Sequence, residues 1–184
     1  MNTIKIINMF KSGLLDFGPI FVFVFVFEFA GFFKATFAIM VTTIIITIIA
    51  FKKEHRIPYF ALAMTLLTVV FGYFTLEFRD PKFLQIKDTI QDGLFAISIL
   101  GSIVLKKPLL KSLFSHLFDV SDKVWKGVAL NWGLHFLVLA ITNEYVRTHF
   151  DPHIWVRYKL FAMFLTLTHG LIIAIYYRKE VFKK

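Results

Sequence analysis

The chain lacks several features on which whole classes of function depend. Its 184 residues include no cysteine, which excludes a disulfide framework, a thiolate metal site and a cysteine nucleophile. It contains no glycine-rich phosphate loop and no nucleophile elbow. Charge is also scarce, because 18% of the residues are charged and only 12 are Asp or Glu, whereas about 25% charged residues is usual in a soluble domain. This composition does not suit a surface that faces water everywhere.

Basic residues outnumber acidic ones and give a formal net charge of +9. A nucleic-acid-binding protein gathers such charge on one face or stripe. Here Lys and Arg occur in short clusters between apolar runs, as in the cytoplasmic loops of membrane proteins. The pattern favours membrane lipids as partners and indicates no nucleic acid.

Apolar residues are abundant, at 58% of the total with 24 phenylalanines. Six apolar segments approach the roughly 20 residues that a helix needs to cross a bilayer. A backbone in lipid must satisfy its own hydrogen bonds, and these segments do not alternate like barrel strands, so we predict helices. All five prolines lie at or near segment ends. The predicted spans cover residues 17–33, 35–51, 57–76, 89–105, 124–142 and 160–177.

The predicted fold is therefore all-α, a polytopic transmembrane helix bundle forming one integral-membrane domain over residues 1–184. With six spans, 14 Lys and Arg residues lie on the side of both termini and 7 on the other side. This asymmetry predicts that both termini are cytoplasmic. Five spans are the alternative, because Glu28 interrupts the first segment. The numbers of Lys and Arg residues on the two sides then become 12 and 9, and the asymmetry is weaker.

Residues 109–119 carry apolar side chains on one half of a helical wheel and polar side chains on the other. Lys106 and Lys107 come directly before them. We expect a short interfacial helix on the inner leaflet. A helix packed against its own bundle is the alternative.

Small and weakly polar side chains line one face of each of two predicted spans. They are Thr65, Thr68, Gly72 and Thr75 in the third span, and Thr36, Thr43 and Thr47 in the second. Such faces allow helices to approach closely and to share hydrogen bonds. We interpret them as a helix–helix seam, with a substrate pathway as the alternative.

Polar residues inside apolar segments are functional candidates by default. Asn131 and His135 lie four residues apart on one helical face, and His169 lies in the last span. We interpret the histidines as hydrogen-bonded within the bundle, with a proton relay or ligand contact as the alternative. Glu28 lies toward the predicted outer end of its span, where a carboxylate needs a cation or water. Its candidate partners on that side are Arg79, Lys87 and Lys159.

Catalytic groups are few. His149 and His153 are four residues apart, but Pro152 between them breaks the helix that would direct both to one metal ion. Asp88 and Asp92 are interpreted as acids at a helix start, where they interact favourably with the helix dipole. No acid–base set is assembled in the sequence, so the residues do not favour an enzyme, and an integral-membrane enzyme is kept only as an alternative.

Several motifs recur in order along the central and C-terminal parts of the chain. They are Phe71-Gly72, Thr75-Leu76, Ile86-Lys87, Leu94-Phe95-Ala96, Gly101-Ser102, Lys106-Lys107-Pro108-Leu109, Val124-Trp125, Asn143-Glu144-Tyr145-Val146, Trp155-Val156 and Leu165-Thr166-Leu167. Together they resemble the intracellular septation protein A family, the YciB-type inner-membrane proteins of bacteria. Asp88 departs from the family pattern, which usually has a proline after the lysine that corresponds to Lys87.

The resemblance implies a bacterial inner-membrane protein of cell division and of cell-envelope biogenesis and integrity. It implies contacts with division or envelope-synthesis proteins in the membrane, and neither an enzymatic activity nor a cofactor. A small transporter or lipid-handling membrane protein is the alternative. On the predicted topology, one set of polar residues shares the outer side, and we expect it to form a binding site or a clamp between spans. This set is Glu28, Arg79, Asp80, Lys87, Thr89, Asn143, Glu144, Trp155 and Lys159.

Overall fold

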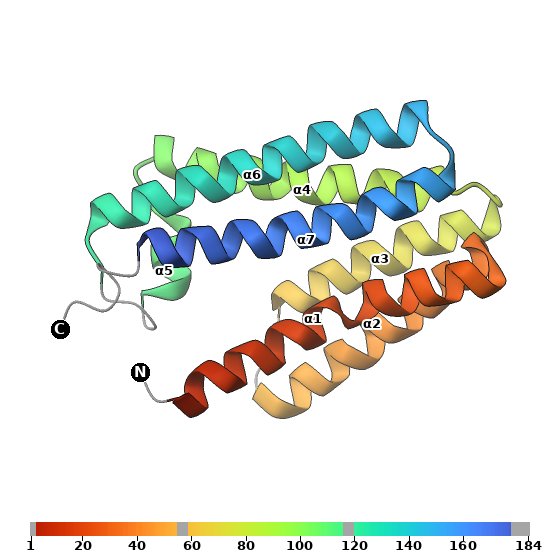
Figure 1. The fold of residues 1–184 in the computed structure, drawn as a ribbon, viewed down its shortest axis with the longest axis horizontal. Helices are drawn as coiled ribbons and strands as arrows, with labels where there is room; N and C mark the ends of the chain where they lie inside the picture. The colour runs from red at the N-terminus through yellow and green to blue at the C-terminus, as the bar shows by residue number, and fades with distance from the viewer. Residues whose placement is uncertain (1–2, 55–58, 116–119, 178–184) are drawn as a thin grey trace. The chain divides into compact units, whose positions relative to one another are not determined.

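The computed structural model describes residues 3–54, 59–115 and 120–177, with side chains described from residue 17 to 52 and again from residue 59. The described residues form seven α-helices and no strand (Figure 1). The all-α prediction is therefore confirmed. The chain divides into two compact units, Met1–Lys87 and Asp88–Lys184, and each is described by itself.

The first unit contains α1 (Thr3–Ala30), α2 (Phe32–Glu54) and α3 (Tyr59–Glu77). One residue, Gly31, separates α1 from α2 with a φ of +80°, a left-handed conformation that glycine adopts without strain. Its N–H donates to the Phe27 carbonyl over 3.0 Å, so α1 ends there and the chain reverses. Pro19 lies inside α1, so the prediction that every proline falls at or near a helix end is wrong for this residue. The apolar pattern begins at residue 17, but the helix begins earlier.

The seam between α2 and α3 is built from the small and hydroxylated residues that the sequence places there. The hydroxyl oxygens of Thr47 and Thr65 lie 2.6 Å apart in a hydrogen bond between the helices. Gly72 faces Met40 so closely that an added Cβ would lie 2.5 Å from the methionine sulfur. The side chain of Thr36 is fully buried. The prediction of a helix–helix seam is confirmed.

A short turn leads from α3 into α4 (Lys82–Val104). The Thr75 hydroxyl donates to the Phe71 carbonyl and accepts from the Leu84 N–H, each over 2.9 Å, which joins the start of α4 to α3. Since α4 begins at Lys82, Asp88 and Asp92 lie beyond its first turn. The interpretation of these two residues as acids at a helix start is therefore wrong.

The second unit contains the rest of α4 together with α5 (Leu109–Phe114), α6 (Asp122–His149) and α7 (Pro152–Tyr176). The turn between α6 and α7 is only two residues long, which brings the two helices back alongside each other (Figure 1). Asp151 caps α7 by accepting the N–H groups of His153 (2.7 Å) and Ile154 (3.1 Å). Pro152 stands at the first helical position, where no N–H is needed.

The predicted interfacial helix at 109–119 is described in part. Its helix runs over Leu109–Phe114, and residues 116–119 lie outside the described residues. Lys111 forms a 2.5 Å ion pair with Asp122 at the start of α6, so α5 is attached to its own unit by at least this contact. Its place on the inner leaflet stays a prediction.

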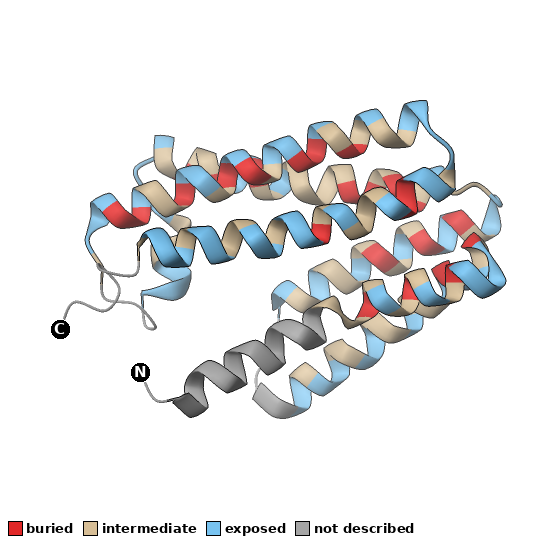
Figure 2. Cartoon of the chain, in the orientation of Figure 1, coloured by how far each residue is buried: buried red, intermediate tan, exposed pale blue. Residues whose placement is uncertain are grey.

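Exposed positions recur along the helices (Figure 2), and many of them carry large apolar side chains. Phe25, Phe29 and Ile97 are 67%, 78% and 72% exposed, which would be unfavourable in water and is favourable in lipid. Among the residues that the structure describes, four helices are long and apolar enough to cross a membrane. They are α2 over Phe32–Lys52, α3, α6 and α7, whereas the apolar part of α1, Phe17–Ala30, is shorter. The chain is an all-α membrane protein, and the count of six spans stays a prediction.

Candidate functional site

Polar side chains of α4, α6 and α7 meet near the turn between α6 and α7. That turn places the first residues of α7 beside the last residues of α6, so Asn143 and Trp155 come together although 12 residues separate them. The Trp155 indole N–H donates to the Asn143 side-chain oxygen over 2.9 Å. Both side chains are 1% exposed, so neither group relies on water for this bond.

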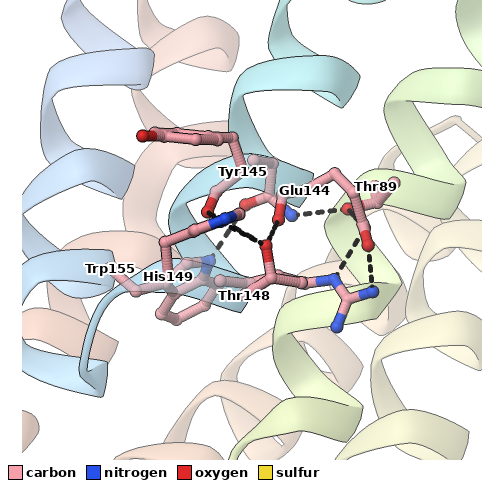
Figure 3. A network of polar contacts seen from close by, with 8 residues as sticks. Thr89, Glu144, Tyr145, Thr148, His149 and Trp155 are labelled. Atoms are coloured by element: carbon pink, nitrogen blue, oxygen red, sulfur yellow. Dashed lines mark hydrogen bonds and ion pairs between the residues drawn. The ribbon is translucent and has the colours of Figure 1, made fainter.

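The hydrogen bonds continue from Asn143 to α4 and return to α6 (Figure 3). The Asn143 side-chain amide donates to the Thr89 hydroxyl over 2.8 Å. The Thr89 hydroxyl in turn donates to the Glu144 carboxylate over 3.1 Å. All the donors from Trp155 onward therefore point toward one carboxylate, and bonds aligned in this way strengthen one another.

Glu144 receives a second set of donors from Arg147, one turn later on α6 (Figure 3). Arg147 Nε donates to Glu144 Oε2 over 2.7 Å, and Arg147 Nη2 contacts Oε1. This is the two-pronged geometry that a guanidinium and a carboxylate favour. The Glu144 carboxylate is thus held by Thr89 from α4 and by Arg147 from its own helix.

A buried ion pair ties α4 to α7. The Lys159 ammonium contacts the Asp88 carboxylate, and Asp88 is 4% exposed. The same ammonium lies 5.7 Å from the centroid of the Trp155 ring, a distance at which a cation is attracted to the ring face. Because Asp88 and Thr89 are adjacent, a single turn of α4 is bonded to both α6 and α7.

We name this arrangement the polar clamp. It comprises Asp88, Thr89, Asn143, Glu144, Arg147, Trp155 and Lys159. Charges removed from water are tolerated when they are paired and hydrogen-bonded, and breaking such a pair costs about 3–5 kcal/mol. The charged groups of the clamp contact opposite charges, and its neutral groups bond one another, so its chemistry fixes three helices in register. In the described part of the chain, no three His, Cys, Asp or Glu side chains are grouped as metal ligands.

Five of the nine residues predicted to form an outer cluster belong to the polar clamp: Thr89, Asn143, Glu144, Trp155 and Lys159. The other four lie in the first unit. The Arg79 guanidinium lies over the Phe33 ring, Asp80 accepts the Lys82 N–H, Lys87 is buried, and Glu28 is exposed. Among the described residues of that unit, no Lys or Arg forms an ion pair with Glu28. A single cluster of all nine residues stays a prediction.

The two intramembrane histidines meet between α6 and α7. Their rings stack with centroids 4.3 Å apart and planes 9° apart, and His135 Nε2 lies 3.0 Å from the Thr166 hydroxyl. His169 Nε2 is buried without a hydrogen-bond partner among the described residues, so the predicted hydrogen bond exists for His135, while stacking replaces it for His169. Asn131 is separate, because its amide donates to the Gly127 carbonyl of its own helix over 2.8 Å.

Two members of the polar clamp were missed by the sequence analysis, Asp88 and Arg147. The spacing of Glu144 and Arg147, three residues apart on a helix, is that of an ion pair and was available as a signal. Asp88 was assigned to a helix start because the apolar pattern begins at residue 89, whereas the helix begins at Lys82. Asp88 also departs from the family pattern, but its partner on α7 is 71 residues away and no local spacing links the two.

Comparisons with known proteins agree with the fold. The family model described as intracellular septation protein A matches residues 12–184. The chain is similar to the inner membrane-spanning protein YciB of Shewanella amazonensis, with 34% identity over 169 residues, 91% of this chain and 93% of the relative. It is equally similar to the protein of that name from Yersinia pestis strain Pestoides F, at 34% over 165 residues, 89% and 92% of the two chains. No solved structure matches the chain.

Proposed function

The chain belongs to the intracellular septation protein A family, and from that premise we propose that it is a multi-pass inner-membrane protein of cell division. It supports septation and the biogenesis and integrity of the cell envelope. It acts through contacts with division or envelope-synthesis proteins in the membrane and not by catalysis. The observation that carries the proposal is the family match, which extends over residues 12–184.

The polar clamp supports a role without catalysis. Catalytic acids and bases are held so that they face a substrate. In the clamp, the Glu144 carboxylate is bonded by Thr89 and Arg147, and the Asp88 carboxylate by Lys159. These groups therefore serve the packing of α4, α6 and α7, and the outer faces of the helices remain for lipid and for protein partners.

The distribution of basic residues supports an orientation with both termini in the cytoplasm. On the six-span topology, 14 of the 21 Lys and Arg residues lie on the side of the termini. Division and envelope proteins with cytoplasmic, membrane and outer parts are then all within reach of some part of the chain.

Purification in native lipid discs tests the proposal directly. The tagged protein is expressed at its natural level, and mass spectrometry compares the proteins and lipids that it retains with those of an unrelated multi-pass inner-membrane protein carrying the same tag. We expect stoichiometric retention of division or cell-wall proteins, and an altered cell-length distribution when the gene is removed. The proposal would be contradicted if no protein were retained in larger amounts than with the control protein and cell lengths stayed normal. Enrichment of one lipid without any protein partner would favour the lipid-handling alternative.

A further inference from the structure

A shallow cleft of about 570 Å³ opens in the first unit where α2 begins and α3 ends. Two cations and three apolar side chains line it: Lys34 and Arg79, together with Phe33, Phe37 and Leu76. None of these residues belongs to the polar clamp. The combination of two positive charges with an apolar lining is complementary to an anionic amphiphile.

Arg79 adopts a left-handed backbone conformation just after α3 ends. Its φ is 53°, in the left-handed region where a residue with a Cβ is strained and glycine is not. Such strain is stored at functional positions more often than elsewhere. The Arg79 guanidinium lies 5.5 Å from the centroid of the Phe33 ring, so the conformation holds its charge beside the cleft.

In the part of the chain that the structure describes, no carboxylate forms an ion pair with Lys34 or Arg79. The nearby Asp80 carboxylate already accepts the Lys82 N–H over 2.9 Å. The positive charge at the cleft is therefore available to an external anion.

The depth of the cleft suits a lipid. Lys34 is the third residue of α2, and Arg79 lies two residues after the last residue of α3. Because both helices are long and apolar enough to cross the membrane, their ends lie at the level of the lipid headgroups. Phe37, which is 60% exposed, lies a turn deeper along α2, where acyl chains run.

We propose that this cleft binds a phospholipid with an anionic headgroup. The headgroup phosphate lies between the Lys34 ammonium and the Arg79 guanidinium, and an acyl chain runs along Phe37 and Leu76. A free phosphate would use the charges but not the apolar lining. The site goes beyond the proposed role in septation, and either can fail without the other.

Lipid quenching at a single introduced cysteine tests the site, because the natural chain has none. Glu77→Cys, an exposed position beside the cleft, carries a fluorophore, and the protein is placed in bilayers that contain brominated phosphatidylglycerol or brominated phosphatidylcholine at equal mole fractions. We expect the anionic lipid to be preferred by up to about 25-fold, because each of the two cations contributes up to about fivefold. The preference should fall to about one in a variant with both Lys34→Gln and Arg79→Asn, since asparagine tolerates the left-handed backbone.

Lys82→Gln is the matched control, because Lys82 is an exposed cation close in sequence that does not line the cleft. It should keep the preference, as should Lys34→Arg. Equal quenching by the two lipids in the parent protein would overturn the proposal. A preference that survives the double variant, or that Lys82→Gln removes equally, would also overturn it. Full displacement of the lipid by millimolar inorganic phosphate would assign the site to a soluble anion instead.

Discussion

Trp155 donates its indole N–H to the side-chain oxygen of Asn143 over 2.9 Å, and each of the two side chains is 1% exposed. A buried polar group without a partner costs about 1–3 kcal/mol, so this bond disfavours any other alignment of α6 with α7. Asn143 also donates to Thr89 on α4. One amide therefore sets the register of three helices.

Replacing Asn143 should be costly, while replacing another asparagine of the same helix should not. Asn143→Leu removes the acceptor of the Trp155 N–H and the donor to Thr89, and we expect it to lower the free energy of unfolding by about 1–3 kcal/mol. Asn131→Leu is the control, because Asn131 is exposed and bonds only its own helix, and it should change stability by about 0.5 kcal/mol or less. Denaturant unfolding in detergent micelles measures both. Equal effects of the two variants would contradict the role assigned to Asn143.

The Asp88–Lys159 pair should behave as a buried ion pair. Lys159→Met removes the cation that contacts the buried Asp88 carboxylate and should cost about 3–5 kcal/mol. A double variant with Asp88→Leu and Lys159→Met should regain most of that loss, because the buried carboxylate that contacted Lys159 is then removed as well. The same unfolding assay measures both variants.

The exposed pair Lys111–Asp122, whose side chains are 42% and 80% exposed, is the comparison for the buried pair. Lys111→Met should cost about 1 kcal/mol or less, since exposed pairs contribute little. If Lys159→Met were as mild as Lys111→Met, or if the double variant were no better than the single one, the buried pair would not be what holds α4 to α7.

The sequence predicts the helices and the α2–α3 seam because both depend on local spacing. Apolar runs of membrane length require helices, and Thr65 and Gly72 lie on one face by helical period alone. The ends of the helices were less predictable, because apolar patterning marks the part of a helix that meets lipid. α4 begins at Lys82 within a polar stretch, seven residues before the apolar pattern begins at residue 89. The prediction that Asp88 lies at a helix start is wrong for this reason.

The sequence does not predict which residues of the polar clamp contact one another, and the reason is different. The predicted topology groups Asn143, Trp155 and Lys159 on one side of the membrane, but it does not say which of these side chains contact one another. Thr89 bonds residues 54 and 55 positions away, and those contacts depend on how α4, α6 and α7 pack. Arg147 was the exception, since its spacing from Glu144 could have been read directly.

The stacked histidines should differ in their response to the same substitution. His169→Phe keeps a flat ring against His135 and removes a buried nitrogen that has no partner among the described residues, so we expect stability to be unchanged or higher. His135→Phe leaves the Thr166 hydroxyl without its 3.0 Å partner and should cost about 1 kcal/mol. Thermal unfolding at one pH compares them. A loss for His169→Phe as large as that for His135→Phe would indicate that His169 binds something beyond the bundle.

The cytoplasmic placement of the termini can be checked with introduced cysteines, because the chain has no natural ones. With six spans, a cysteine at Lys184 should be protected from an impermeant thiol reagent in intact cells, and a cysteine at Asp151, in the exposed turn between α6 and α7, should be labelled. Permeabilised cells provide the control, since both positions should then react. Labelling of the Lys184→Cys variant from outside would reject the predicted topology.

Gly72 should tolerate no large side chain unless Met40 is shortened. A Cβ at Gly72 would lie 2.5 Å from the Met40 sulfur and 3.5 Å from Thr36 Cγ2, so Gly72→Leu forces α2 and α3 apart and should cost about 1–3 kcal/mol. Adding Met40→Ala makes room and should recover much of that loss. Gly101→Leu is the control, because nothing lies within 4 Å of a Cβ added there and leucine favours a helix by up to about 1 kcal/mol over glycine. The free energy of unfolding of each variant measures these effects. If Gly72→Leu were no more destabilising than Gly101→Leu, or if Met40→Ala recovered none of the loss, α2 and α3 would not approach closely at this seam.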